Sequence, residues 1–172
     1  MRTDADVFAN IVNHMLSGIM FHDQMYQYFL FLRLYSFAKD HKKRYKEESD
    51  SYQKINKYYI THRNALIDER PVNPSSYIPV EWKKMNRFQL TKDDIQKAVI
   101  FAINSWVEWE QQTKTFYTDC YNDLMKTGFA AEAEEVMDLL KDVDKELSEA
   151  ESLQLYLEAI KYDMVEIMEI NK

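Results

Sequence analysis

The sequence predicts an all-α protein, a four-helix bundle made of two antiparallel hairpins joined by a long crossover. Glycine and proline, which punctuate strands and tight turns, occur only two and three times among the 172 residues. All-β and α/β folds need turn residues about every ten positions, so this scarcity favours a few long helices. Apolar residues also recur at spacings of three and four, which is the period of a helix buried along one face.

The first helix is expected to run from about residue 4 to residue 39. Thr3 and Asp6 form a capping-box pattern at its start. The polar segment "KDHKKR" then places the turn near residue 42. The second helix should run from about 43 to 69, because Pro71 disfavours a helical residue before it. The inward stripe of the first helix comprises Phe8, Ile11, Val12, Met15, Ile19, Tyr26, Phe29, Leu30 and Phe37.

Residues 70–91 contain all three prolines and are expected to form the crossover. The third helix is expected over 92–127, after the capping pattern "TKDD" and before Gly128, and the fourth over 130–170. An extended crossover of about 20 residues reaches roughly 66 Å, whereas a helix of about 26 residues is roughly 39 Å long. The chain can therefore return along the bundle, which predicts an up-down-down-up order within a single domain, 1–172.

Composition excludes several classes of function. The net charge of −7 argues against a nucleic-acid-binding protein, and the one basic cluster, "KDHKKRYK", is interpreted as a solvated turn. No apolar run approaches the roughly 20 residues that span a membrane. Cys120 is the only cysteine, and the acidic start "MRTDADVF" does not resemble a signal peptide. We therefore expect a cytoplasmic protein with no nucleic-acid or membrane partner.

The first hairpin is predicted to bring two histidines to the same height. With the turn near residue 42, His22 and His62 lie equally far along the chain on either side of it. Each histidine falls on the apolar stripe of its helix and should point inward. Asp23 follows His22 directly and adds an acidic group at this level.

The second hairpin adds two carboxylates by the same reasoning. Glu110 and Glu146 lie equally far before and after Gly128, so they should face each other across the hairpin. Buried charges need partners, so two outcomes are open. The groups either hydrogen-bond one another and set the helix register, or they bind one or two metal ions. The predicted mid-height layer comprises His22, Asp23, His62, Glu110 and Glu146.

With "HDQMYQYF" on the first helix and "WVEWEQQ" on the third, this layout resembles the ferritin-like superfamily. The resemblance covers most of the chain and rests on the helix layout. It implies a carboxylate on the first and third helices, where Asp23 and Glu110 match. It also implies a Glu-x-x-His motif on the second and fourth helices, where the chain has "EESDSY" and "ELSE" without histidine. The resemblance thus implies a divergent member that lacks the standard di-iron motifs.

Two functional hypotheses follow. The leading one is a non-catalytic structural or protein-interaction module, without a cofactor, that binds a protein partner or associates as a homodimer. It is motivated by the missing histidine ligands and by the lack of a glycine-rich phosphate loop or zinc-binding spacing. The alternative is a metal-binding oxidoreductase-type protein that holds iron or manganese. Its atypical ligands would be His22, Asp23, His62, Glu110 and Glu146.

Overall fold

The protein is all-α, as predicted. The computed structural model describes residues 3–67, 77–79 and 82–171, and within these residues there is no β-strand. Two short 3₁₀ turns, Trp82–Lys84 and Arg87–Gln89, precede the third long helix. The helices are α1 (Asp4–Leu32), α2 (Tyr35–Arg63), α3 (Lys92–Thr127), α4 (Ala130–Ala159) and α5 (Met164–Ile170).

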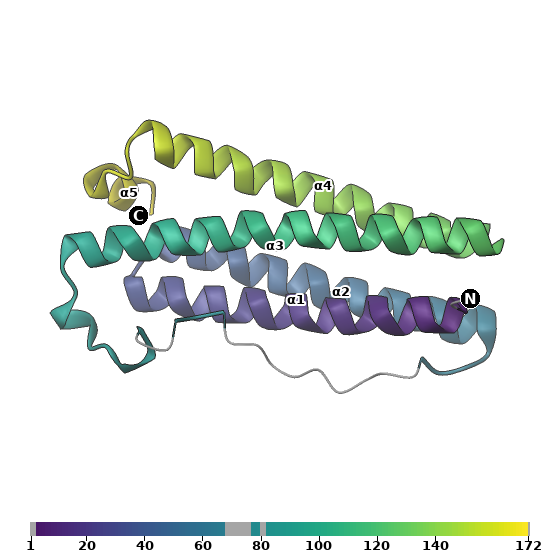
Figure 1. Ribbon diagram of the computed structural model, residues 1–172. Helices are drawn as coiled ribbons and strands as arrows, with labels where there is room; N and C mark the ends of the chain where they lie inside the picture. Colours follow the sequence, from purple (N-terminus) through teal and green to yellow (C-terminus); the bar gives the residue numbers. More distant parts are fainter. Residues whose placement is uncertain (1–2, 68–76, 80–81, 172) are drawn as a thin grey trace.

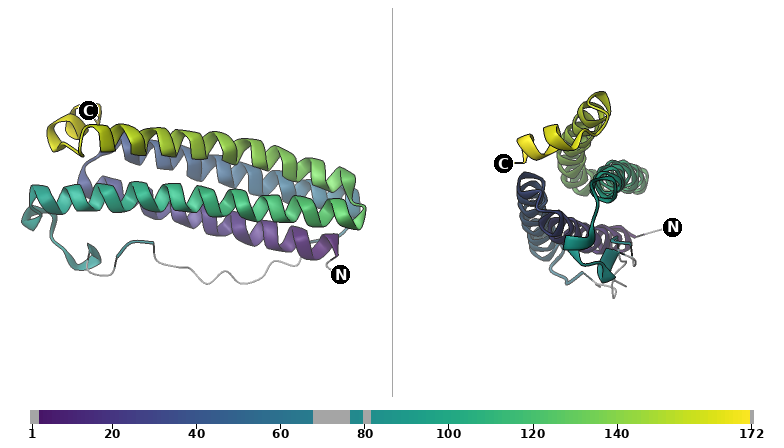
Figure 2. Two further views of the ribbon diagram at one scale, coloured as in Figure 1. Left: turned by 45° about the horizontal axis from the view of Figure 1, so that its top comes forward. Right: turned by 90° about the vertical axis from the view of Figure 1, so that its left-hand side faces the viewer.

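Four long helices form two antiparallel hairpins, α1 with α2 and α3 with α4, and α1 packs against α3 (Figure 1). The end of α2 and the start of α3 lie at opposite ends of the molecule, so the chain runs up, down, down, up (Figure 1). The end-on view in Figure 2 shows the two hairpins side by side. Among the described residues, α2 and α4 do not pack closely on each other, and charged side chains connect them instead.

Both predicted capping boxes are present. The Thr3 hydroxyl accepts a hydrogen bond from the Asp6 N–H, and the Asp6 carboxylate accepts one from the Thr3 N–H. Thr91 and Asp94 make the same pair of bonds at the start of α3. Each box satisfies N–H groups that have no partner within the helix, which explains why α1 and α3 begin where the sequence predicts.

The second hairpin turns at Gly128, as predicted. Gly128 adopts a left-handed conformation (φ 85°) and its N–H donates to the carbonyl of Met125. The next N–H, of Phe129, donates to the carbonyl of Leu124. This pair of bonds is the Schellman motif, which ends a helix and reverses the chain at once. The third helix therefore covers the expected range, 92–127.

The predicted turn near residue 42 is wrong. α1 ends at Leu32, not near 39, and α2 begins at Tyr35, not near 43. The turn is a second Schellman motif, in which Arg33 takes the left-handed conformation (φ 59°) and the Leu34 N–H donates to the carbonyl of Phe29. Leu34 is fully buried. The motif is closed by this apolar contact and contains no glycine or proline, so the sequence offers no polar turn signal here.

The end of the fourth helix also differs from the prediction. α4 stops at Ala159, because Lys161 and Tyr162 both have positive φ angles of 53° and the chain bends before α5. The predicted range 130–170 is therefore two helices. α5 lies against the start of α2, where Asn171 Oδ1 accepts a hydrogen bond from the Phe37 N–H over 3.1 Å. In the end-on view α5 (yellow) lies on the α2 side of α4 (Figure 2).

The apolar interior consists of two clusters, one near each end of the hairpins. The first contains Phe21, Met25, Phe29, Ile103 and Trp106, with other residues of α1, α3 and α4. The second contains residues from the opposite ends of α1 and α3 and from the start of α4, including buried Cys120. The helix segments between the clusters carry buried polar side chains. No helix of the described chain is both long enough and apolar enough to span a bilayer.

The left-handed turn at Arg33 gives a stability prediction. A side chain in this conformation costs about 1 kcal/mol relative to glycine. We therefore expect the free energy of unfolding of Arg33→Gly, measured by denaturant titration, to exceed that of Arg33→Ala by about 1 kcal/mol. Both variants lose the same side-chain contacts, so the difference reports the backbone strain. Gly128→Ala should lower the free energy of unfolding by a similar amount relative to the wild type. The added Cβ meets no atom within 4 Å, so only the backbone is strained. Equal stability of the two Arg33 variants would contradict this account of the turn.

Candidate functional site

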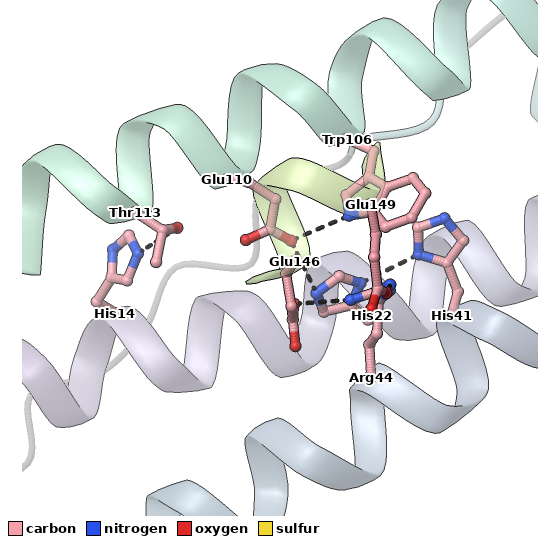
Figure 3. Close-up of polar contacts among 9 residues, drawn as sticks. All are labelled: His14, His22, His41, Arg44, Trp106, Glu110, Thr113, Glu146 and Glu149. Atoms are coloured by element: carbon pink, nitrogen blue, oxygen red, sulfur yellow. Dashed lines mark hydrogen bonds and ion pairs between the residues drawn. The ribbon is translucent and has the colours of Figure 1, made fainter. Parts of the chain in front are cut away.

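A layer of ionisable side chains lies between the two apolar clusters. It receives side chains from all four long helices, and Figure 3 shows them directed toward one another. His22 comes from α1, His41 and Arg44 from α2, Glu110 from α3, and Glu146 from α4. His22, His41, Arg44 and Glu110 are buried, and Glu146 is largely so. Such a cluster of buried titratable groups on converging helices is a candidate functional site.

His22, Glu110 and Glu146 form the centre of this layer. One ligand atom from each residue can be chosen so that all three atoms lie within 4.8 Å of one another. The closest approach between His22 and Glu110 joins Nε2 to Oε1 and measures 3.7 Å (Figure 3). The Trp106 indole N–H donates to the same Glu110 oxygen over 3.0 Å. One imidazole and two carboxylates thus converge from three different helices.

The two histidines of the layer hydrogen-bond each other through Nδ1, over 3.1 Å. Burial lowers the pKa of His41 to about 3 and lowers the pKa of His22 well below its ordinary value, with nearby positive charges adding to the effect. Both rings are therefore neutral at physiological pH, and one of the two Nδ1 atoms must carry the shared proton. His22 Nε2 is buried and has no hydrogen-bond partner among the described residues. This nitrogen is the unsatisfied polar atom at the centre of the layer.

Arg44 supplies the positive charge of the layer. Its Nη1 lies 3.1 Å from Glu146 Oε2, and its Nη2 lies 2.5 Å from Glu149 Oε2. The guanidinium carbon is also 4.5 Å from the ring centroid of Trp106, a distance suited to a cation–π contact. Arg44 therefore connects α2 to α4 and neutralises carboxylates that α4 directs toward the interior.

Glu48 is a further carboxyl group of the layer, and Gly18 makes room for it. A Cβ at Gly18 would lie 2.9 Å from Glu48 Oε1 and 3.4 Å from Cζ2 of Trp109. Burial raises the pKa of Glu48 to about 8, with the charges of Glu146 and Asp142 contributing to the rise. Glu48 is therefore largely protonated at neutral pH. A glycine in the middle of α1 is explained by the close approach of this carboxyl group.

Burial also raises the pKa of Glu110 well above its ordinary value, and the neighbouring charge of Glu146 adds to this rise. The pKa of Glu146 is raised by burial too, but Arg44 and a hydrogen bond with Glu110 oppose the rise. We therefore assign the proton to Glu110, which donates to Glu146, while Glu146 stays ionised beside Arg44. With Arg44 as its cation, the layer limits its negative charge to Glu146 and the half-exposed Glu149 by keeping Glu48 and Glu110 protonated.

A cavity of about 300 Å³ opens beside the layer between α2 and α4. Arg44, Glu48, Glu146 and Glu149 line it, together with Asp142 and Lys145. Between Ala38 and Ile55, the buried residues of α2 are the polar His41 and Arg44. The carboxyl groups of Glu48, Glu146 and Glu149 therefore border a space large enough for water and small ions.

The structure brings together three of the five predicted site residues: His22, Glu110 and Glu146. Asp23 lies outside the layer, where its carboxylate accepts a hydrogen bond from the Gln27 side chain over 2.7 Å. His62 is exposed at the end of α2, stacked on Tyr58 with 4.2 Å between ring centroids. The expectation that His62 faces His22 is wrong, because the first hairpin turns at Arg33 and not near residue 42.

Sequence reasoning missed His41, Arg44 and Glu48, which the true turn brings near His22. Their positions follow from the turn at Arg33 and Leu34, since residues at similar distances on either side of it lie at similar heights. One available signal was that α2 has no aliphatic residue between Ala38 and Ile55. A helix with a polar inward face must have polar partners, so this pattern indicates site residues within the segment.

A fourth histidine, His14, lies nearby but outside the layer. Its ring stacks on Trp109 and Phe116, and its Nε2 is 2.9 Å from the Thr113 hydroxyl (Figure 3). Burial lowers the pKa of His14 to about 4, so the ring is neutral and makes this bond without a charge. His14 is therefore a packing residue.

Comparison with models of known protein families finds no match, and no curated protein matches the sequence.

The raised pKa of Glu48 predicts a pH-dependent stability. The pKa of Glu48 is about 8 in the folded protein and about 4.5 in the unfolded chain. Its contribution to the free energy of unfolding is therefore complete below pH 4.5 and is lost as the pH rises through 8. Buried His41 acts at lower pH, since its contribution is lost as pH falls from 6.5 toward 3. Between pH 6.5 and 8 any fall in the free energy of unfolding with rising pH should therefore come from buried carboxyl groups.

The measurement is the slope of the free energy of unfolding against pH, obtained by denaturant titration with a chelator present. Glu48→Gln should make this slope shallower by up to about 1.4 kcal/mol per pH unit. Glu47→Gln is the matched control, because Glu47 is exposed on the same helix and should keep the wild-type slope. An unchanged slope in Glu48→Gln would show that the Glu48 carboxyl group is ionised in the folded protein.

Proposed function

We propose that this protein is a metal-binding helical bundle of ferritin-like arrangement, in which His22, Glu110 and Glu146 bind one divalent ion. The observation that carries the proposal is the buried His22 Nε2, which faces Glu110 and has no hydrogen-bond partner among the described residues. A neutral imidazole presents a lone pair to a metal, and Glu146 together with Glu110, which would release its proton when the ion binds, would complete a nitrogen and oxygen donor set. Iron(II) and manganese(II) suit such donors.

The surroundings of His22 support this assignment. A metal-bound histidine commonly donates its other N–H to a second group, which fixes the ring. His41 Nδ1 is placed to accept that hydrogen bond from His22 Nδ1. Trp106 fixes Glu110 in the same way by donating to its Oε1. An ion at this point would supply positive charge on the Glu110 side of the layer, whereas Arg44 directs its ion pairs to α4.

The arrangement also departs from the standard ferritin-like pattern. Glu149 stands on α4 where that pattern places a histidine, and Arg44 pairs with it. This departure supports a second candidate, the non-catalytic structural module, in which the layer only joins the two hairpins. In that case the charge of the Arg44 guanidinium is already balanced by its ion pairs with Glu146 and Glu149. A protein partner or a homodimer belongs to this second proposal.

Metal analysis distinguishes the two functions. We expect the protein, purified without chelator and loaded with Mn²⁺, to retain one ion per chain when measured by plasma mass spectrometry. Loss of an outer hydrogen-bond partner of a metal ligand weakens metal affinity by about 10–100-fold. Because His22→Gln and Glu110→Gln each remove a ligand itself, each should weaken the affinity for Mn²⁺ by more than this.

Two matched controls separate ligand loss from general effects. His62→Gln and Glu108→Gln change exposed residues of the same types on α2 and α3 and should bind Mn²⁺ as the wild type does. If the wild type retains no Mn²⁺ or Fe²⁺ while remaining folded, the layer is structural and the metal proposal fails.

A further inference from the structure

Arg44 occupies the space between two carboxylates of α4. Glu146 and Glu149 are three positions apart, so they lie on one face of the helix about one turn apart. The guanidinium contacts one oxygen of each, at 3.1 Å and 2.5 Å. Its side chain is only 8% exposed, and Trp106 covers it from the α3 side. A cation is thus built permanently into the α4 side of the layer.

This contact divides the layer into two halves. On one side, Glu146 faces Glu110 and the unsatisfied Nε2 of His22. On the other side, Glu146 and Glu149 face the cavity, and the guanidinium lies between them. An arginine side chain remains protonated at any physiological pH, so it cannot leave this position by losing its charge.

Removal of the guanidinium would leave a site with the features of a cation site. Glu146 and Glu149 would face the cavity of about 300 Å³ without a counter-charge, and Glu48 lines the same cavity. Among the described residues, the other cations that line this cavity are Lys43 and Lys145. Within that part of the chain, neither lysine forms an ion pair with Glu146 or Glu149.

We propose that Arg44 determines how many ions the layer binds. Its guanidinium takes the place of a cation between Glu146 and Glu149, so the protein holds a single divalent ion on the His22 and Glu110 side. The second position opens only when the positive charge of residue 44 is removed. The single-ion state of the wild type rests on the proposed function, whereas the opening of a new position by loss of Arg44 does not.

The test counts Mn²⁺ ions per chain in three proteins after loading and desalting. The wild type and Arg44→Lys, which keeps the charge, should each hold one ion. Arg44→Met, which keeps an unbranched apolar stem over Trp106 without charge, should hold one ion more than the wild type. Circular dichroism checks that each protein is helical.

Each outcome bears on the proposal. An equal count in Arg44→Met and the wild type overturns it, whether that count is one or none. A wild type that already binds two ions also overturns it. A wild type with no ion and an Arg44→Met variant with one supports the role of Arg44 while the proposed function fails.

A second variant keeps the test independent of the folding of Arg44→Met. Glu149→Gln changes a half-exposed residue that pairs with Arg44 and not with the ion. It should leave one Mn²⁺ bound with a Kd changed by less than about fivefold, since a half-exposed ion pair is weak. Loss of the ion in Glu149→Gln would make Glu149 a ligand and overturn the proposal.

Discussion

The two hairpins meet across a layer of ionisable groups that can remain buried only because they compensate one another. Arg44 of the first hairpin pairs with Glu146 and Glu149 of the second, and Glu110 accepts the Trp106 N–H. Removing a buried member of such a set, such as Arg44, leaves uncompensated charge, which costs several kcal/mol. The layer therefore connects the two hairpins by ion pairs from α2 to α4. Apolar clusters on either side of the layer supply the hydrophobic burial.

The position of each turn decides which residues share the layer. At Gly128 the sequence contains a residue that tolerates the left-handed conformation, so Glu110 and Glu146 were correctly paired from spacing alone. At Arg33 a non-glycine residue takes that conformation, and the buried Leu34 that closes the turn belongs to an apolar run. No local signal separates this run from a continuing helix. The misplaced turn then assigned His62 to a place that α2 fills with other side chains.

The remaining site residues depend on tertiary packing. The Glu48 carboxyl group fits inside because Gly18 on another helix lacks a side chain, and His41 is neutral because burial beside His22 disfavours its charge. Neither condition can be read from the residues next to them in the chain. The apolar periodicity and the crossover length predicted the helix layout, whereas the polar contacts within it had to come from the structure. Helix boundaries with capping boxes were predictable because their signals are local.

The hydrogen bond between Asn171 and Phe37 makes the start of α2 depend on a distant part of the chain. Leu34 provides no side-chain cap, so the Phe37 N–H in the first turn of α2 lacks this partner until the Asn171 side chain arrives from 134 residues downstream. Docking of α5 therefore completes the hydrogen bonding of the first turn of α2, and the local stability of that turn is coupled to the docking of α5.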